Sequence, residues 1–481
     1  MPSRPGRPWR DPPSTPVASR EATSTSWITR RRYSTTSSPV WTSPPAPSKP
    51  LRPRTCHDRQ PVRRRQRCLR GPRLSAVQGA GRAVRETFSG LPAAYWWLWT
   101  STLVNRLGGF VVTFLAMYLT VERSFSASYA GLVAALYGLG GSVAAVIGGV
   151  LSDWIGRRAT LLAASLATAA STAVLGLVTQ PAVIAVTACA VGLASNASRP
   201  AVSAMMADLV APEDQMRAQS LNYWAVNVGF GVSAAVAGLI SAHGWVWLFL
   251  GDALTTLLCA VVVFARVPET RPSEAGTGGT ALVIGLSQVC RDRPFMALVA
   301  LTFLLGTIIQ QAFTTLPVDM GRSGFDAADY GRVVALNGLL IVLLQIPLAR
   351  WAGKRETGVV LPLGALLLGW GFGLTAFAGT SGPGGTSGSV WVYALSVTVW
   401  TLGEIVYTPA SAAAVAGLSP LRARGRYQGV YALAWAAASF VGPAAGGAAT
   451  DAFGTGVVWG ACAVAGTVAA GGFWALTRRP V

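Results

Sequence analysis

Long apolar stretches separated by short polar segments fill the chain beyond about residue 92. Crossing the ~30 Å hydrocarbon core of a bilayer takes about 20 helical residues, and each stretch is long enough to do so. The pattern therefore predicts twelve membrane-spanning helices. Their expected ranges are 94–120, 128–150, 159–178, 181–206, 221–241, 245–265, 295–317, 330–349, 358–378, 390–413, 427–449 and 455–476.

These stretches are continuous and rich in Gly and Ala. The strands of an outer-membrane barrel would instead alternate apolar and polar residues over about ten positions. We therefore expect an all-α membrane protein. Composition agrees, because hydrophobic residues make up 52% of the 481 positions and charged residues only 12%, which is about half the charged share of a soluble domain.

The net charge of +20 is concentrated in the first part of the chain. Residues 1–91 hold 19 of the 39 Lys and Arg but only 4 of the 19 Asp and Glu, which gives +15 for this segment. It is rich in Pro, Ser and Arg without an apolar period, so we expect it to be disordered. Three interpretations stay open: a solvated cytoplasmic arm, a start assigned too far upstream, and an arm that binds nucleic acid or anionic lipid. Aromatic residues for base stacking are sparse there, so no nucleic-acid partner is expected.

The loop charges predict the orientation of the spans. Fifteen Lys and Arg residues, among them Arg157 and Arg158, fall on one side, which we call the arginine-rich side. The opposite side has Arg123 and Arg322, with Arg332 at a helix mouth. Cytoplasmic loops carry the excess of Lys and Arg. We therefore expect a multi-pass protein of the plasma (inner) membrane with both termini in the cytoplasm.

Two sequence motifs that interrupt the apolar pattern each have a second copy further along the chain. GGVLSDWIGRRATLL begins at Gly148, and LARWAGKR, which begins at Leu348, aligns with its centre at a shift of 197 residues. A second pair of segments, around Pro200 and Pro409, aligns at a shift of 209. We therefore predict a duplication into two parallel six-helix repeats. The expected parts are a tail at 1–91, a first half at 92–265, a cytoplasmic linker at 266–292 and a second half at 293–481.

The phrase GGVLSDWIGRR resembles the signature loop between the second and third helices of the major facilitator superfamily of secondary transporters. The resemblance covers the chain from about residue 92 to residue 478. It departs from the signature at Trp154, where the family usually has a basic residue. Membership implies a twelve-helix fold whose two halves rock about a central cavity, lined in this family by the first, fourth, seventh and tenth helices.

A second pattern bears on the direction of transport. FVGPAAGG in the eleventh span resembles the Gly-Pro pattern that drug/proton antiporters of this superfamily carry in the fifth span. In this chain the fifth span has Ser233 and Ala234 at the corresponding positions. The pattern is therefore in the other half of the chain, so import stays open as an alternative to export. The resemblance is still greatest to the drug/proton antiporter type.

The signature loop itself is expected to act as a gate. Gly149 allows close helix packing, and Asp153 stands one turn before Arg157, with which it can pair. The resemblance implies that this cluster latches the cytoplasmic ends of the two halves in the outward-facing state. The alternative is a plain topology anchor. The gate residues are Gly149, Asp153, Gly156, Arg157 and Arg158.

Charged residues inside membrane spans are costly and usually functional. Four of them lie well inside the expected spans: Arg106, Arg199, Asp252 and Glu404. The shift of 209 carries Glu404 onto Ser195, one turn from Arg199, so the two charges should lie at similar depths. We expect Glu404 to be the leading proton-coupling carboxylate, with Arg106 and Arg199 as partners that tune it. A permanent buried ion pair is the alternative for Glu404, and a local capping contact is the alternative for Asp252.

Polar and aromatic residues in the fifth, seventh and eighth spans are candidates for the substrate cavity. Each is also an ordinary choice for packing helices together in a membrane. A cavity with aromatic residues and few charges suits a lipophilic solute. The candidates are Tyr223, Trp224, Asn227, Gln310, Gln311 and Asn337.

No pattern points to a metal, a cofactor or an enzyme. The six Cys and two His, His57 and His243, have no metal-ligand spacing, and AGKRE is not a phosphate-binding loop. We expect a proton-coupled transporter, a monomer, that exports a small amphipathic compound by alternating access. A proton-coupled importer and a membrane sensor or scaffold that does not transport are the alternatives.

Overall fold

The computed structural model describes residues 90–270, 289–378, 390–420 and 424–478. The expected tail and most of the linker lie outside these ranges, as does the side chain of Asp153. Every regular element of the described ranges is helical, which confirms the expected all-α fold. Twelve helices are long and apolar enough to cross a membrane, and they match the twelve expected spans.

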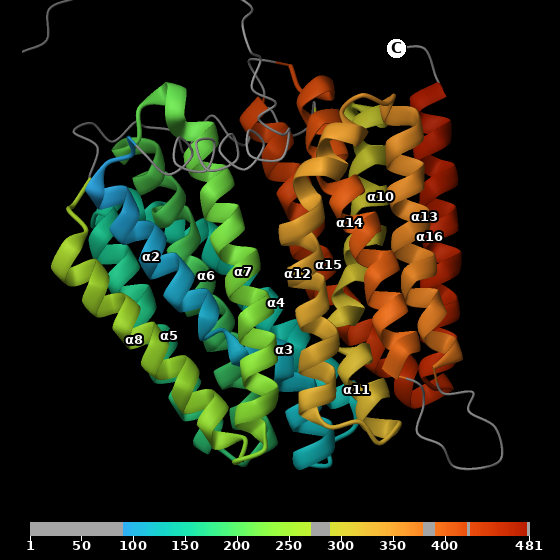
Figure 1. Ribbon diagram of the computed structural model, residues 1–481, viewed down its shortest axis with the longest axis horizontal. Coiled ribbons are helices and arrows are strands. Elements are labelled where there is room, and N and C mark those ends of the chain that lie inside the picture. The colour runs from blue at the N-terminus through green and yellow to red at the C-terminus, as the bar shows by residue number, and fades with distance from the viewer. Residues whose placement is uncertain (1–89, 271–288, 379–389, 421–423, 479–481) are drawn as a thin grey trace, which may run out of the picture. The chain divides into compact units, whose positions relative to one another are not determined.

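The helices of the first half are shown in blue to yellow-green in Figure 1. They are α2 (Ala93–Leu107), α3 (Phe110–Met117), α4 (Ala127–Trp154), α5 (Arg157–Leu177), α6 (Pro181–Leu209), α7 (Gln215–Ser241) and α8 (Val246–Arg266). The helices of the second half are shown in yellow to red. They are α10 (Arg293–Ile309), α11 (Thr315–Arg322), α12 (Ala327–Ala352), α13 (Thr357–Gly373), α14 (Val390–Leu418), α15 (Arg424–Phe453) and α16 (Thr455–Arg478).

The first and seventh spans are interrupted, which the continuous apolar pattern did not predict. In the first, α2 ends before Gly108 and α3 begins at Phe110. A Cβ at Gly108 would overlap with Thr255 of α8, so only glycine fits where the two spans cross. In the seventh, a short 3₁₀ turn at Gln310–Ala312 separates α10 from α11. Glycine lowers the cost of the first break because it is conformationally permissive.

Within each half, helices pack through small residues. A Cβ at Gly192 of α6 would overlap with the carbonyl oxygen of Tyr137, so α6 lies directly against the backbone of α4. Gly369 of α13 and Gly466 of α16 face each other in the same way in the second half. Lipid tails are as apolar as Leu, so helices in a bilayer associate mainly by such close van der Waals contact.

The two halves meet along two helix pairs, α4 with α15 and α7 with α12. A Cβ at Gly131 or Gly138 of α4 would overlap with carbonyl groups of α15, and a Cβ at Gly238 of α7 would lie 2.7 Å from the Cα of Ala328 in α12. Gly149 lies on the same face of α4 as Gly138, because eleven residues make about three turns. A Cβ at Gly149 meets nothing within 4 Å. The α4 and α15 backbones are therefore in contact toward the opposite side, whereas at Gly149, toward the arginine-rich side, no described residue would meet an added Cβ.

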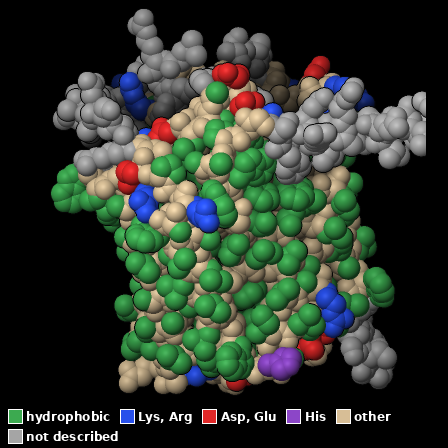
Figure 2. Space-filling model, turned by 60° about the vertical axis from the view of Figure 1, so that its left-hand side comes forward, with side chains coloured by type: hydrophobic (Ala, Val, Ile, Leu, Met, Phe, Trp, Pro, Cys, Tyr) green, Lys and Arg blue, Asp and Glu red, His purple; other side chains and the backbone are tan. Residues whose placement is uncertain are grey.

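The outer surface of the helices is apolar. Figure 2 shows hydrophobic side chains over most of the height of the visible face, with charged groups gathered toward its ends. Large apolar residues such as Val186, Leu239 and Phe264 are exposed in the structure. Exposed apolar surface on this scale is abnormal in water. It is what a protein solvated by lipid requires.

Replacing Gly192 by Val tests the close packing of α6 on α4, since the new side chain would overlap with the backbone at Tyr137. Overpacking costs about 1–3 kcal/mol. We expect the unfolding temperature of the purified protein in detergent to fall by several degrees. Gly460→Val in α16 is the matched control, because a Cβ at Gly460 meets nothing within 4 Å. Equal unfolding temperatures for the two variants would contradict the packing described here.

Candidate functional site

Glu404 lies on α14, half-buried, at the contact between α14 and α12. The side-chain amide of Asn337, on α12, donates to Glu404 Oε2 at 3.2 Å. The same amide nitrogen also donates to the hydroxyl of Thr401 at 3.0 Å, one turn before Glu404 on α14. The carboxylate expected to couple protons and one of the expected cavity residues are therefore in direct contact. Both partners of this amide come from one helix, so α12 and α14 are joined at this level.

The two intramembrane arginines are not in contact with Glu404. Four ion pairs are formed among the described residues, and none includes Arg106, Arg199 or Glu404. Arg106 is in the last turn of α2, packed against Gly229 of α7. Arg199, on α6, is exposed and lies within electrostatic reach of Arg106. In this conformation the first half presents the cations and the second half presents the carboxylate, without an ion pair between them.

Asp252 has a local contact that the interrupted first span explains. Its carboxylate is buried on α8 and accepts the backbone N–H of Val111 at 3.2 Å. Val111 is in the first turn of α3, and the N-cap residue of that helix, Gly109, has no side chain to bond its free N–H groups. First-turn N–H groups need an acceptor when they are buried. The contact matches the capping role that the sequence left open for Asp252.

Aromatic side chains from α7 extend the site on the first half. Tyr223 and Trp224 are 37% and 40% exposed, and Trp224 stacks on Trp99 of α2 with ring centroids 6.5 Å apart. Tyr223 lies within electrostatic reach of Glu404. Asn227 is buried, and its side-chain amide bonds one turn back to the carbonyl oxygen of Tyr223 at 2.9 Å. Tyr223 and Trp224 thus present accessible aromatic faces, whereas Asn227 makes a helix-packing contact.

Gln311 lies in the 3₁₀ turn that interrupts the seventh span, and its side chain bonds neighbouring groups there. Its side chain is buried, donates to the carbonyl oxygen of Gly442 on α15 at 3.0 Å, and accepts from Thr315 at 2.7 Å. The side chain of Gln310 packs next to Gly442. These contacts join the 3₁₀ turn to the Gly-Pro segment of α15. The polar groups of Gln311 are used within the protein, which favours the packing interpretation for this residue.

The signature loop forms a compact cluster at the arginine-rich side. Gly156 has φ +101°, a conformation that favours glycine, and it is the N-cap of α5. Glu269, which follows α8, accepts the backbone N–H groups of Arg157 at 2.8 Å and of Arg158 at 3.3 Å. Glu269 thus supplies the cap that Gly156 cannot. The sequence did not single out Glu269, since a VPETRP segment after a span is common.

Both arginines of the cluster are also held by their side chains. Arg157 is buried and forms an ion pair with Asp208 of α6, in addition to donating to the carbonyl oxygen of Ala204 at 3.2 Å. Arg158 donates to the carbonyl oxygen of Phe264 and lies over its ring, 5.3 Å from the centroid. All these partners belong to the first half. The cluster therefore braces α5, α6 and α8 against one another in this conformation.

Two acidic residues near helix ends were missed because the expected spans ended too early. Asp319 lies in α11, beyond the expected end at residue 317, and is buried. Its Oδ2 accepts from the hydroxyl of Tyr393 at 3.0 Å and from the indole of Trp459 at 3.3 Å. Asp451 lies in α15, beyond the expected end at residue 449. The apolar pattern fades before a helix stops, so acids in the last turn were counted as loop residues.

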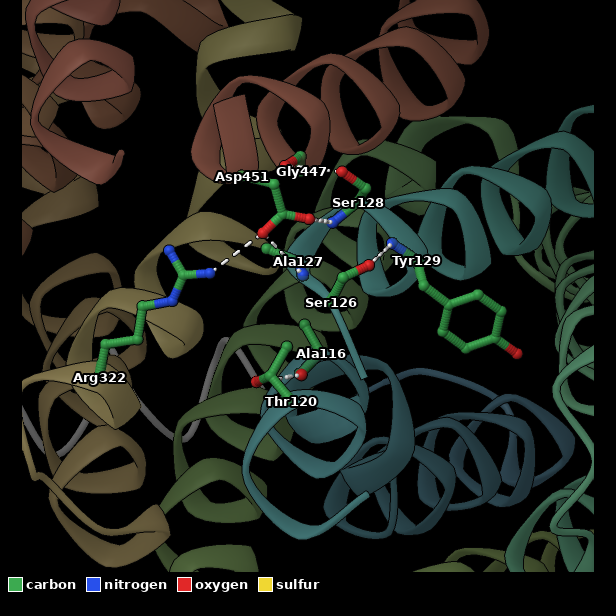
Figure 3. Close-up of polar contacts among 9 residues, drawn as sticks. All are labelled: Ala116, Thr120, Ser126, Ala127, Ser128, Tyr129, Arg322, Gly447 and Asp451. Atoms are coloured by element: carbon green, nitrogen blue, oxygen red, sulfur yellow. Dashed lines mark hydrogen bonds and ion pairs between the residues drawn. The ribbon is translucent and has the colours of Figure 1, made fainter. Parts of the chain in front are cut away.

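Asp451 joins the two halves at the opposite side, as Figure 3 shows. Its carboxylate accepts the backbone N–H of Ala127 at 3.2 Å and of Ser128 at 2.6 Å, both in the first turn of α4. Arg322, at the end of α11, donates to the same carboxylate at 3.1 Å. Ser126 accepts the N–H of Tyr129 at 3.1 Å. Three first-turn donors of α4 are thus satisfied, two of them by the other half of the molecule.

Comparison with known proteins places these features in a family. The model of the Major Facilitator Superfamily matches residues 98–404 and 324–481. The chain is 27% identical over 307 residues to the multidrug resistance protein MdtH of Cronobacter sakazakii, covering 64% of this chain and 74% of that protein. It is 28% identical over 350 residues to the uncharacterized MFS-type transporter YttB of Bacillus subtilis, covering 70% of this chain and 83% of that protein.

Solved structures share the fold. The nucleoside transporter NupG superposes with a TM-score of 0.69 at 13% identity, covering 81% of this chain and 100% of that chain. A POT family transporter in complex with 5-aminolevulinic acid superposes with a TM-score of 0.66 at 17% identity, covering 81% and 96%. With its twelve apolar helices and the match of the family model along most of its length, the chain is a multi-pass membrane protein that belongs to the Major Facilitator Superfamily of secondary transporters.

Proposed function

We propose that this transporter is a proton-coupled exporter of a small amphipathic compound, a drug or secondary metabolite, in the plasma membrane. The observation that carries the proposal is the position of Glu404. It is a half-buried carboxylate inside a span, bonded by the neutral amide of Asn337 and within electrostatic reach of the partly exposed Tyr223 of the other half. A charged residue in that position is expensive, which marks a functional site.

The contacts of Glu404 suit a group that gains and loses a proton. No guanidinium within ion-pair distance holds it permanently charged, since none of the ion pairs among the described residues includes it. Arg106 and Arg199 remain candidates for partners in another conformation. An amide donor can stay bonded to either oxygen while the other oxygen takes up a proton. Proton binding would then respond to whatever moves Asn337.

The contact between α7 and α12, where the two halves meet, connects Asn337 to movement of the halves. Asn337 is followed by Gly338, which packs against the α7 backbone at Gly231 and Asn227. When α7 and α12 move relative to each other, the contact next to Asn337 must change. We infer that rocking of the halves alters the hydrogen bond to Glu404, and that protonation of Glu404 biases the rocking in return.

The aromatic residues indicate the solute. Tyr223 lies within electrostatic reach of Glu404, and Trp224, next to it in α7, stacks on Trp99. Aromatic rings with a single carboxylate suit a solute with an apolar body and a small polar part. The described residues leave α4 open at Gly149, toward the arginine-rich side, which we propose to be cytoplasmic. Solute would then enter from the cytoplasm. The relative named as a multidrug resistance protein supports export.

Efflux of lipophilic fluorescent dyes from loaded cells, with and without an uncoupler of the proton gradient, tests the proposal. We expect export that the uncoupler abolishes, and loss of that uncoupler-sensitive export in Glu404→Gln, because the glutamine amide cannot take up and release a proton as the carboxylate does. Glu213→Gln is the matched control, since Glu213 is exposed in the loop before α7.

The remaining outcomes separate the alternatives. Export that persists in Glu404→Gln at the wild-type rate would reject Glu404 as the coupling residue. Absence of dye export from cells that hold the protein in their membranes would reject export of such solutes and favour import. A scaffold would be indifferent to both the uncoupler and the substitution.

Asp252 is expected to act as a cap, and two substitutions separate capping from coupling. Asp252→Asn keeps an oxygen that accepts the N–H of Val111, whereas Asp252→Ala leaves that N–H without a partner. An unsatisfied buried donor costs about 1–3 kcal/mol. We expect a lower unfolding temperature in Asp252→Ala and near wild-type stability and dye export in Asp252→Asn. Stable Asp252→Asn protein that has lost uncoupler-sensitive export would instead assign a coupling role to this carboxylate.

A further inference from the structure

The contact of Asp451 with α4 lies between the two halves, on the side away from the signature loop. Its carboxylate accepts two backbone N–H groups, from Ala127 and Ser128. The first-turn N–H groups of a helix have no partner inside the helix, and the helix dipole places partial positive charge there. An anion held at that position is stabilised both by hydrogen bonds and by the dipole. Asp451 thus acts as an N-cap donated from another part of the molecule.

The local cap of α4 is incomplete without this carboxylate. Ser126 is the N-cap residue, and its hydroxyl reaches the N–H of Tyr129. The N–H groups of Ala127 and Ser128 are left to Asp451. If Asp451 withdraws, these two donors must turn to water. The contact therefore differs in free energy between a closed and an open arrangement of α4 and α15.

Arg322 adds a third element to the same carboxylate. It stands at the end of α11 and bonds the Oδ1 that also accepts from Ala127. The side chain of Arg322 is half-exposed, and an ion pair between exposed groups contributes little by itself. Its position is informative, because it joins the ends of α11 and α15 to the beginning of α4 at one point.

Next to the Asp451 contact, the backbones of α4 and α15 touch each other. They cannot move apart there without also breaking the Asp451 contact. A Cβ at Gly447 would overlap with the carbonyl oxygen of Ala127, and a Cβ at Gly131 would overlap with that of Pro443. The hydroxyl of Ser128 also donates to the carbonyl oxygen of Gly447 at 3.5 Å. Any opening of the halves on this side separates α15 from α4 here. It must release Asp451 first.

We propose that Asp451 is the gate residue of the opposite side: its carboxylate on the N-terminus of α4 holds that side closed, and its release is a required step of opening. Asp153 stands in the last turn of the same helix, so α4 carries a gate element at each end. The two ends exchange if α4 and α15 pivot on the contact of Gly138 with Ser439, which lies between them. The proposal rests on alternating access and is independent of the solute and of proton coupling.

Distances between spin labels on the two halves test the proposal directly. One pair, Ala242→Cys with Gly456→Cys, reports the opposite side, and a second pair, Ala207→Cys with Gly417→Cys, reports the arginine-rich side. All four positions are exposed, and added side chains at Gly417 and Gly456 meet nothing within 4 Å. The native cysteines are replaced, and double electron–electron resonance is recorded in lipid nanodiscs.

We expect Asp451→Asn to raise the ratio of open to closed distances at the opposite side by about threefold or more, the range that a helix N-terminal charge gives. Distances at the arginine-rich side should shorten in step. Glu122→Gln is the matched control, because Glu122 is an exposed acid near the outer end of the first span. Distributions in Asp451→Asn that equal those of Glu122→Gln would reject the gate. Widening at the opposite side alone would reject the exchange between the two ends.

Two further variants guard against loss of folding. Asp451→Glu keeps the charge and should restore part of the closed population, which a merely structural defect would not do. Ala127→Pro leaves every charge in place but removes one N–H and puts a ring carbon where the carboxylate lies. Proline is favoured at the first helical position, and the extended ψ of Ser126 suits a following proline. It should open the opposite side as Asp451→Asn does, and a closed distribution would contradict the proposal.

Discussion

Close approach of helix backbones at glycine is the constraint on which the rest of the molecule depends. A bilayer has no water to satisfy polar groups and gives little hydrophobic driving force between helices, so helices associate where small residues let them touch. Between the halves this occurs where α4 meets α15 and α7 meets α12, at Gly131, Gly138 and Gly238 among others. These contacts determine where the halves are joined, and therefore also where they are free to part. The candidate site lies next to one of them, because Asn337 precedes the packed Gly338.

The periodic properties of the chain were predictable from the sequence, and its local exceptions were not. Twelve apolar stretches gave twelve helices because length and hydropathy are sufficient to specify a span in lipid. At the break after α2, Gly108 lies so close to Thr255 of α8 that a Cβ would not fit there. This is a contact between residues far apart in sequence. Asp319 and Asp451 were missed for a related reason. Helices extend past their apolar stretch where a tertiary partner, such as Tyr393 or the first turn of α4, satisfies a polar residue at the end.

The candidate site was predictable as a set of residues but not as a set of contacts. An intramembrane carboxylate such as Glu404 stands out in any hydropathy pattern, because its position is costly. Its partner does not. The repeat placed Glu404 level with Arg199, and the intramembrane arginines were the expected partners that tune it, yet in this structure the carboxylate bonds Asn337 from the neighbouring helix. Internal symmetry fixes depth in the membrane. It does not fix which face of a helix meets which neighbour, and that depends on the packing of small residues.

Two carboxylates at the membrane boundaries, Glu269 and Asp451, bond the first turn of a helix from outside that helix, where its own N-cap residue leaves donors free. Such a contact can be withdrawn at low cost, because water reaches helix ends and replaces the lost acceptor. The carboxylate of Asp252 is buried at the break between α2 and α3, where water does not reach to replace it as an acceptor. Reversible contacts therefore belong at helix ends and permanent ones in the interior. Under the proposed gating by Asp451, this division lets the ends of α4 change partners during transport while the interrupted spans keep their shape around the site.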